Sequence, residues 1–131
     1  MTVKRYDKHS TEFGLWLREQ EEIDSGKGYL ATNVDFMWKN WKTKQWMLIE
    51  EKRYNSDCKQ WQVRMFNLLN KCAQCSQHFY GFHLLQFEKT SPEDGLMYLN
   101  KREITKKDLL DFLQFRKDKS WYAGWFTGDK L

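Results

Sequence analysis

The chain has 131 residues, of which 40% are hydrophobic and 17% aromatic, so it can fill a sizeable core, and intrinsic disorder is excluded. Its 22 lysines and arginines exceed its 18 aspartates and glutamates, which gives a net charge of +4. That excess permits a nucleic-acid partner without requiring one. Three cysteines are an odd number, which argues against a disulfide framework.

No stretch of sequence approaches the ~20 uncharged apolar residues that a membrane span needs. Residues 1–5 also lack the apolar segment of a signal peptide. We therefore expect a soluble, cytoplasmic protein with no membrane partner. The chain has one proline and no Gly/Ser-rich linker, which predicts a single domain over residues 1–131.

The N-terminal part of the chain predicts a helix over residues 10–24. Ser10 can cap it, and Phe13, Trp16 and Leu17 recur at helical spacing. A polar, glycine-containing run at residues 24–28 ends the helix in a loop.

A hairpin is predicted next, within residues 29–54. Two apolar runs, residues 29–38 and 46–49, flank the short polar run 39–44. Two such runs around a polar turn are typical of paired antiparallel strands. If the chain turns about the Lys42–Thr43 peptide, the numbers of paired residues add up to 85.

The second half of the chain predicts helices and strands in alternation. A helix is expected over residues 57–74, and its buried face is expected to carry Trp61, Met65, Leu68 and Leu69. Strands follow at residues 79–87 and 96–99, and Thr105 with Asp108 resembles a capping box for a last helix over residues 105–117. This order predicts an α/β fold with a small mixed β-sheet flanked by helices.

Two carboxylates face each other in the predicted hairpin. The expected register places Asp35 directly opposite Glu50, and carboxylates in that position repel each other. A divalent cation relieves the repulsion, and Mg²⁺ prefers oxygen ligands. Side chains alternate along a strand, so Lys52 shares the face of Glu50, while Glu51 points to the other face. The Lys52 ammonium could hold a water or stabilise charge that develops on a phosphate.

These residues resemble the PD-(D/E)xK nuclease superfamily, in Asp35 at the end of Asn33-Val34-Asp35 and in the Glu50-Glu51-Lys52 tripeptide. The order of helix, antiparallel hairpin and helix resembles it too, over about residues 10–75. The resemblance implies a restriction-endonuclease-like core and a phosphodiesterase that uses Mg²⁺, with Mn²⁺ able to substitute.

The resemblance also implies roles for individual residues. Asp35 and Glu50 would bind the metal together with the backbone carbonyl of Glu51, and Lys52 would be the catalytic lysine. Many members of the superfamily add a glutamate from the first helix. Glu12 and Glu19 are both candidates here, and Glu12 is slightly preferred. Some members add a glutamine from the helix after the motif. Here the spacing does not distinguish between Gln60 and Gln62, and we include Gln62 in the predicted site.

Basic residues interleaved with aromatic ones suit a phosphate backbone and exposed bases. Two groups fit that description, and the candidate DNA-binding residues are Lys39, Lys42, Lys44 and Trp41 at the hairpin turn and Lys106 and Lys107 at the start of the last helix. We therefore expect a DNA endonuclease, resolvase-like or of a phage repair or recombination type. One active site cuts one strand, so a domain of this size that cuts duplexes or junctions favours a homodimer.

Two other functions compete with the nuclease. A non-catalytic nucleic-acid-binding or interaction module would use the same fold without a metal. A zinc-binding protein would use Cys72, Cys75 and His78, with Cys58 as a fourth ligand. Cys58 and Cys72 are fourteen residues apart on one predicted helix, or ~21 Å, which argues against that site.

His83 is expected to be structural or to face a groove, and the apolar stretch 121–126 is expected to pack on the core or to form a dimer contact.

Overall fold

A computed structural model of the chain describes residues 11–123. Contacts between backbone positions divide the chain into two compact units, with the boundary between Thr32 and Asn33. The prediction of one domain over residues 1–131 therefore stays a prediction.

The first unit contains a shorter helix than the sequence predicted. Helix α1 spans Glu12–Glu19, and its cap is Thr11, whose hydroxyl accepts a hydrogen bond from Gly14 N at 3.0 Å. Ser10, the predicted cap, lies outside the described residues. The helix ends because Gln20 adopts an extended backbone, and the chain then continues in two short 3₁₀ turns, Glu21–Ile23 and Ser25–Lys27.

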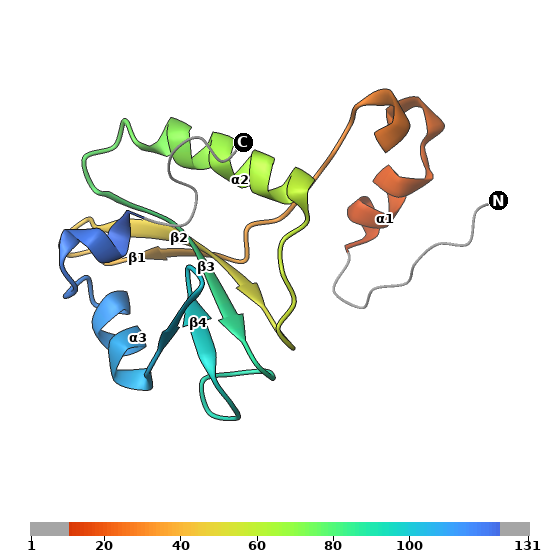
Figure 1. Cartoon of the computed structure of the whole chain (residues 1–131). Coiled ribbons are helices and arrows are strands. Elements are labelled where there is room, and N and C mark those ends of the chain that lie inside the picture. Colours follow the sequence, from red (N-terminus) through yellow and green to blue (C-terminus); the bar gives the residue numbers. More distant parts are fainter. Residues whose placement is uncertain (1–10, 124–131) are drawn as a thin grey trace. The chain divides into compact units, whose positions relative to one another are not determined.

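The second unit is built on one five-stranded mixed sheet with the strand order β1-β2-β3-β4-β5 (Figure 1). Its strands are β1 (Phe36–Lys39), β2 (Trp46–Lys52), β3 (Phe79–Phe87), β4 (Met97–Leu99) and β5 (Arg102–Ile104). Strand β2 pairs in parallel with β3, and the other neighbours pair antiparallel. The mixed sheet is confirmed, and β5 is a strand that the sequence analysis missed.

The predicted hairpin register is confirmed. Phe36 pairs with Ile49 and Lys39 pairs with Trp46, so each pair of residue numbers adds up to 85. Strand β1 is shorter than the predicted run of residues 29–38, and the chain before Phe36 is irregular. The side chain of Asn40 fixes the turn, because its Oδ1 accepts hydrogen bonds from the backbone N–H groups of Lys42 and Thr43.

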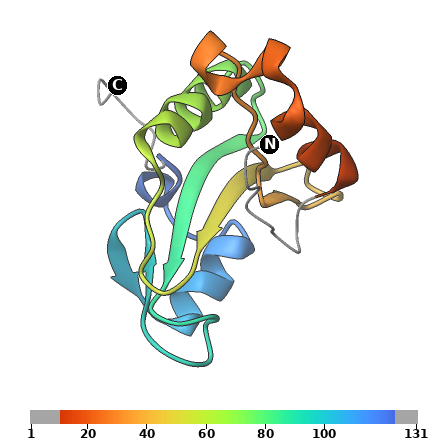
Figure 2. The ribbon, with the colours of Figure 1, turned by 90° about the vertical axis from the view of Figure 1, so that its right-hand side faces the viewer.

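Two helices cover opposite faces of the sheet (Figures 1 and 2). Helix α2 (Gln60–Ala73) packs Phe66 against Leu48 and Phe82 on one face. Helix α3 (Lys106–Leu113) packs Leu109 and Phe112 on the other face, among core residues of β2, β3, β4 and β5. The second unit thus has three layers, helix, sheet and helix.

The buried face of α2 differs from the predicted one. Leu68 is 64% exposed and Leu69 38% exposed, whereas Phe66, Asn67 and Asn70 are buried. The polar Asn70 is buried because its Oδ1 accepts a hydrogen bond from Phe82 N at 3.1 Å. The buried face of α2 is therefore the one that supplies a hydrogen-bond acceptor to a backbone N–H group of the sheet, rather than the one with the most apolar residues.

The last helix begins as predicted. The Thr105 hydroxyl accepts a hydrogen bond from Asp108 N, and the Asp108 carboxylate accepts one from Thr105 N, which is a complete capping box. A short 3₁₀ helix, η3 (Lys119–Tyr122), follows and places Tyr122 in the core. The expectation that this segment packs on the core is confirmed for Trp121 and Tyr122, and residues 124–126 lie outside the described part.

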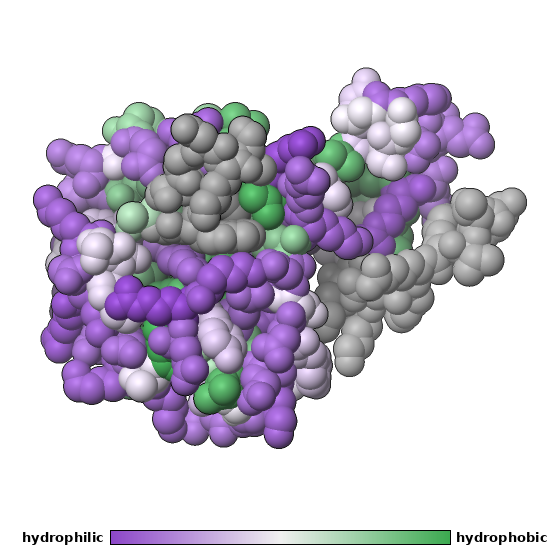
Figure 3. All heavy atoms as spheres, viewed as in Figure 1, coloured by the Kyte–Doolittle hydropathy of each residue, from purple (hydrophilic) through white to green (hydrophobic). Residues whose placement is uncertain are grey.

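Hydrophilic residues predominate on the face of the second unit seen in Figure 3, with hydrophobic residues in small separate areas. Among residues 11–123, no helix is both long enough and apolar enough to cross a membrane.

Candidate active site

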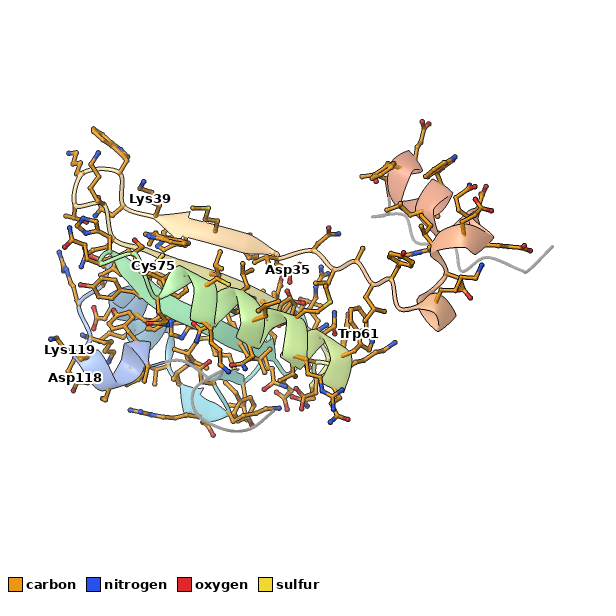
Figure 4. The ribbon with its side chains drawn as sticks, turned by 90° about the horizontal axis from the view of Figure 1, so that it is seen from above. Asp35, Lys39, Trp61, Cys75, Asp118 and Lys119 are labelled. Atoms are coloured by element: carbon orange, nitrogen blue, oxygen red, sulfur yellow. The ribbon has the colours of Figure 1, made fainter. Side chains whose placement is uncertain are left out.

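The carboxylate pair lies where β1 begins and β2 ends. Asp35 is one residue beyond the last pair of the hairpin, Phe36 with Ile49, so the register places it beside Glu50. Asp35 Oδ2 accepts a hydrogen bond from the backbone N–H of Glu51 at 2.8 Å, which holds the carboxylate against β2. Figure 4 shows Asp35 at one end of β1 and Lys39 at the other.

Glu50 is a buried carboxyl group with an unsatisfied oxygen. The residue is 4% exposed, and its Oε1 has no hydrogen-bond partner among the described residues. The pKa of Glu50 is raised from 4.5 to about 7, mainly by burial and then by the neighbouring Asp35 carboxylate, while Lys52 acts in the opposite direction. A buried polar atom without a partner is costly, and such atoms are uncommon in folded proteins. This oxygen is therefore a candidate for contact with a ligand.

Lys52 and Gln62 complete the cluster. Lys52 Nζ lies 3.4 Å from Glu50 Oε2 and 3.4 Å from Gln62 Oε1. Gln62 is in the first turn of α2, and its Oε1 also accepts a hydrogen bond from Lys59 N at 3.2 Å. The spacing left Gln60 and Gln62 equivalent, and the structure brings Gln62 to the lysine. The shared face of Glu50 and Lys52 is confirmed.

Glu51 lies on the opposite face of the sheet. Its carboxylate is 3.7 Å from Arg53 Nε and lines a mostly apolar pocket of about 270 Å³ beside α3. The side chain is therefore outside the cluster, and only the predicted role of its backbone carbonyl remains. Glu12 and Glu19 belong to the first unit, in α1, so their part in the site stays a prediction.

Gln86, which was not among the predicted site residues, pairs with Lys52 across β2 and β3. Gln86 is buried, and its Nε2 donates a hydrogen bond to Ser56 O at 2.8 Å. Together with His83, it is a buried polar residue in a strand, residues 79–87, that is mostly apolar. That contrast is the signal by which it could have been found.

The two predicted basic groups differ in the structure. Lys39, Lys42, Lys44 and Trp41 are exposed at the β1–β2 turn. Lys106 instead forms an ion pair with Glu93 at 2.9 Å, and Lys107 forms one with Asp111 at 2.8 Å. Each lysine of the second group has a carboxylate partner, so the turn is the stronger candidate for binding phosphates.

The alternative zinc site is not assembled. Cys58 precedes α2, while Cys72 lies near its end and Cys75 beyond it; Figure 4 shows Trp61 and Cys75 at opposite ends of this helix. Cys75 Sγ instead contacts the backbone carbonyl of Cys72.

His83 has a structural role. It is fully buried and packs edge-to-face against Phe112. Its Nε2 is 2.6 Å from Tyr80 O, and its Nδ1 is 3.0 Å from the Asn100 amide nitrogen. Burial lowers the pKa of His83 to about 4, so the ring is neutral at physiological pH. This environment excludes it as a base exposed to substrate.

A magnesium ion fits the donors of this cluster. In the described part of the chain, no group of three or more His, Cys, Asp or Glu side chains could hold a metal ion. Asp35 and Glu50 nevertheless provide two carboxylates, and one oxygen of Glu50 has no protein partner. Mg²⁺ keeps several waters and is commonly bound through one or two carboxylates. The donor set therefore matches this ion.

No family model, no curated protein and no solved structure matches the chain in sequence or fold searches. The geometry of the cluster itself is therefore what points to a function.

Proposed function

We propose that the chain is a metal-dependent endonuclease that hydrolyses phosphodiester bonds in DNA, built on a restriction-endonuclease-like core. The observation that carries the proposal is the buried Glu50 carboxylate, with one oxygen unsatisfied, between Asp35 and Lys52. A protein that only binds nucleic acid gains nothing from burying a carboxylate beside another, because the arrangement costs stability.

Asp35 and Glu50 would hold the metal, and the backbone carbonyl of Glu51 is the third proposed ligand. When bound, Mg²⁺ or Mn²⁺ would supply a Lewis acid that neutralises charge on the scissile phosphate. Asp35 is exposed whereas Glu50 is buried, so this edge of the sheet is open to a substrate on the side of Asp35.

Lys52 would act on the phosphate or on the attacking water. Its ammonium group carries three donors, and the contacts to Glu50 and Gln62 leave at least one donor for a substrate oxygen. Gln62 is a positioning residue in this proposal, because its Oε1 restrains the lysine from the first turn of α2. We also propose a homodimer, since two sites related by a two-fold axis would cut both strands of a duplex or a junction.

The second candidate is a nucleic-acid-binding module without catalysis. The observation that favours it is the exposed basic and aromatic turn at Lys39, Trp41 and Lys42. Such a turn can bind a strand without the help of the carboxylate cluster.

Cleavage assays separate the two candidates. Labelled linear, nicked, single-stranded and four-way-junction DNA would be incubated with Mg²⁺, Mn²⁺ or EDTA. We expect metal-dependent cutting by the wild type that Lys52→Ala and Asp35→Asn abolish while DNA binding stays within a few fold. Lys71→Ala, which changes an exposed lysine near the end of α2, is the matched control and should cut normally. Binding without any cutting would instead support the module, and full activity in both site variants would refute the assignment of the site.

A further inference from the structure

The β1–β2 turn and the end of α3 enclose a groove with a volume of about 430 Å³. All of its lining residues belong to the second unit, and they are Trp38, Lys39, Asn40, Trp41, Lys42, Leu113, Gln114 and Arg116. The set combines two indole rings with three cationic side chains and contains no carboxylate. Its chemistry therefore favours a ligand that is both aromatic and anionic.

The cations of the groove are available to a ligand. Within residues 11–123, Lys39, Lys42 and Arg116 form no ion pair, in contrast to Lys106 and Lys107 of α3. Unpaired cations close together on a protein surface repel each other, and phosphates relieve that repulsion. Lys44 is in the same turn but does not line the groove.

Trp41 presents its ring to solvent. The residue is 72% exposed, and Lys42 Nζ lies 5.6 Å from the centre of its ring. An exposed indole of this kind is a platform on which a nucleobase can stack, provided that the base is not already stacked in a duplex. Lys42 would then lie within reach of the phosphate attached to that base.

The walls of the groove are held in place before any ligand binds. Trp38 Nε1 donates a hydrogen bond to Leu113 O at 2.8 Å, which ties β1 to the end of α3. Asn40 Oδ1 accepts hydrogen bonds from Lys42 N at 2.9 Å and Thr43 N at 3.2 Å, which fixes the turn below Trp41. A preorganised site loses less conformational entropy when a ligand binds.

We infer that this groove binds an unpaired stretch of nucleic acid, with a base stacked on Trp41 and neighbouring phosphates on Lys39, Lys42 and Arg116. By contrast, the pocket that contains Glu51 is mostly apolar, and its carboxylate would repel a phosphate. Binding of the strand needs neither a metal nor cleavage, so this inference stands apart from the nuclease.

The groove also has a defined relation to the carboxylate cluster. Asp35 and Lys39 are four residues apart, which corresponds to ~13 Å along a strand, and Figure 4 shows them at opposite ends of β1. Trp38 pairs with Met47 and donates a hydrogen bond to Leu113 O, so its indole lies on the α3 face of the sheet, whereas Glu50 and Lys52 lie on the α2 face. If the proposed nuclease function is correct, the unpaired segment of a substrate that reaches both sites would pass around β1, the edge strand of the sheet. Only this consequence depends on that function.

The test is equilibrium binding measured by fluorescence anisotropy in EDTA, with the Lys52→Ala chain as the starting protein so that no substrate is cut. The probes are labelled oligodeoxyuridylate and labelled oligouridylate, which differ only in the sugar, and a labelled duplex of equal length. We expect both single strands to bind more tightly than the duplex, and the tighter of the two identifies the sugar of the natural ligand. Trp41→Ala should weaken binding by about fivefold to 100-fold, and Trp41→Phe, which keeps a stacking surface, should stay within about threefold of the parent.

Charge variants test the phosphate contacts in the same assay. Lys39→Gln and Arg116→Gln should each lower the salt dependence of binding by about 0.7 in the slope of log K against log salt, while the control Lys71→Gln should leave it unchanged. Equal binding by Trp41→Ala and its parent, or tighter binding of the duplex, would overturn the inference. Unaltered urea midpoints would show that each variant is folded. Binding of single strands in EDTA that Trp41→Ala abolishes would support the proposed binding groove even if the chain cleaved no nucleic acid.

Discussion

Replacing Glu50 with glutamine removes a charge that the fold buries at a cost in stability. Burial and the neighbouring Asp35 raise the pKa of Glu50 from 4.5 to about 7. Each unit of pKa difference between folded and unfolded states corresponds to about 1.4 kcal/mol. The ionised carboxylate therefore lowers the free energy of unfolding by about 3 kcal/mol relative to the protonated form.

The sign of the pH dependence follows from the direction of this shift. Between pH 4.5 and 7 the folded state binds the proton of Glu50 more tightly than the unfolded state does, so the stability of the wild type falls as pH rises through this window. Below it the carboxyl group is protonated in both states. Above it the carboxyl group is ionised in both, and the whole cost is present.

Urea denaturation at pH 5 and pH 8 measures the effect. Any change that glutamine makes in packing or hydrogen bonding is present at both pH values and cancels in the comparison. We expect the free energy of unfolding of Glu50→Gln, relative to the wild type, to be about 2–3 kcal/mol more favourable at pH 8 than at pH 5. Glu103→Gln, which changes an exposed glutamate on β5, is the control and should show a difference below about 0.5 kcal/mol.

An equal effect of Glu50→Gln on the free energy of unfolding at pH 5 and at pH 8 would contradict this prediction, because the carboxylate would then not be buried at a cost. A second arm adds Mg²⁺ at pH 8. A ligand at a hundred times its dissociation constant stabilises the folded state by about 2.7 kcal/mol. The wild type should gain stability of this order, and Glu50→Gln should gain much less.

Three further predictions concern the fold of the second unit. Phe66→Ala should lower the free energy of unfolding by about 3–5 kcal/mol in urea denaturation. Leu68→Ala, at a residue 64% exposed, should lower it by less than about 0.5 kcal/mol. Equal losses of stability in the two variants would contradict the observed buried face of α2. His83→Gln should destabilise the chain at neutral pH. It should also abolish the loss of about 3 kcal/mol in the free energy of unfolding that the wild type undergoes between pH 6.5 and 4, because the folded state keeps the ring neutral with its pKa near 4. An unchanged dependence of stability on pH would argue against that burial. Gly81→Ala should lower the thermal midpoint strongly, because Gly81 has φ 95° and an added Cβ would lie 2.6 Å from Tyr122 O, and a midpoint within a degree or two of the wild type would show that this contact relaxes.

The carboxylate cluster depends partly on strand pairing between nearby residues and partly on packing between distant segments. Asp35 and Glu50 are brought together by a hairpin, whose register depends on a short turn and on alternation along two strands. Gln62 reaches Lys52 only because α2 packs on the same face of the sheet. Spacing in the sequence could therefore find the two carboxylates and could not choose between Gln60 and Gln62.

Local sequence patterns predicted the structure correctly where neighbouring residues determine it. The register of the hairpin, the strand at residues 79–87 and the capping box of Thr105 and Asp108 all follow from contacts within a few residues or across one turn. The chemistry of a strand pair is set by alternation, so the shared face of Glu50 and Lys52 was also predictable.

Tertiary structure decided what depends on the rest of the fold. Helix α2 carries two stripes that could be buried, and the hydrogen bond from Phe82 N to Asn70 selected the stripe with Phe66. Burial of Glu50, and with it a pKa near neutrality, required β3 and α2 to cover the end of β2. Local sequence patterns were enough to predict which residues pair along the hairpin. Which of them lose contact with water depends on packing between distant segments, and that loss of hydration gives the cluster its chemistry.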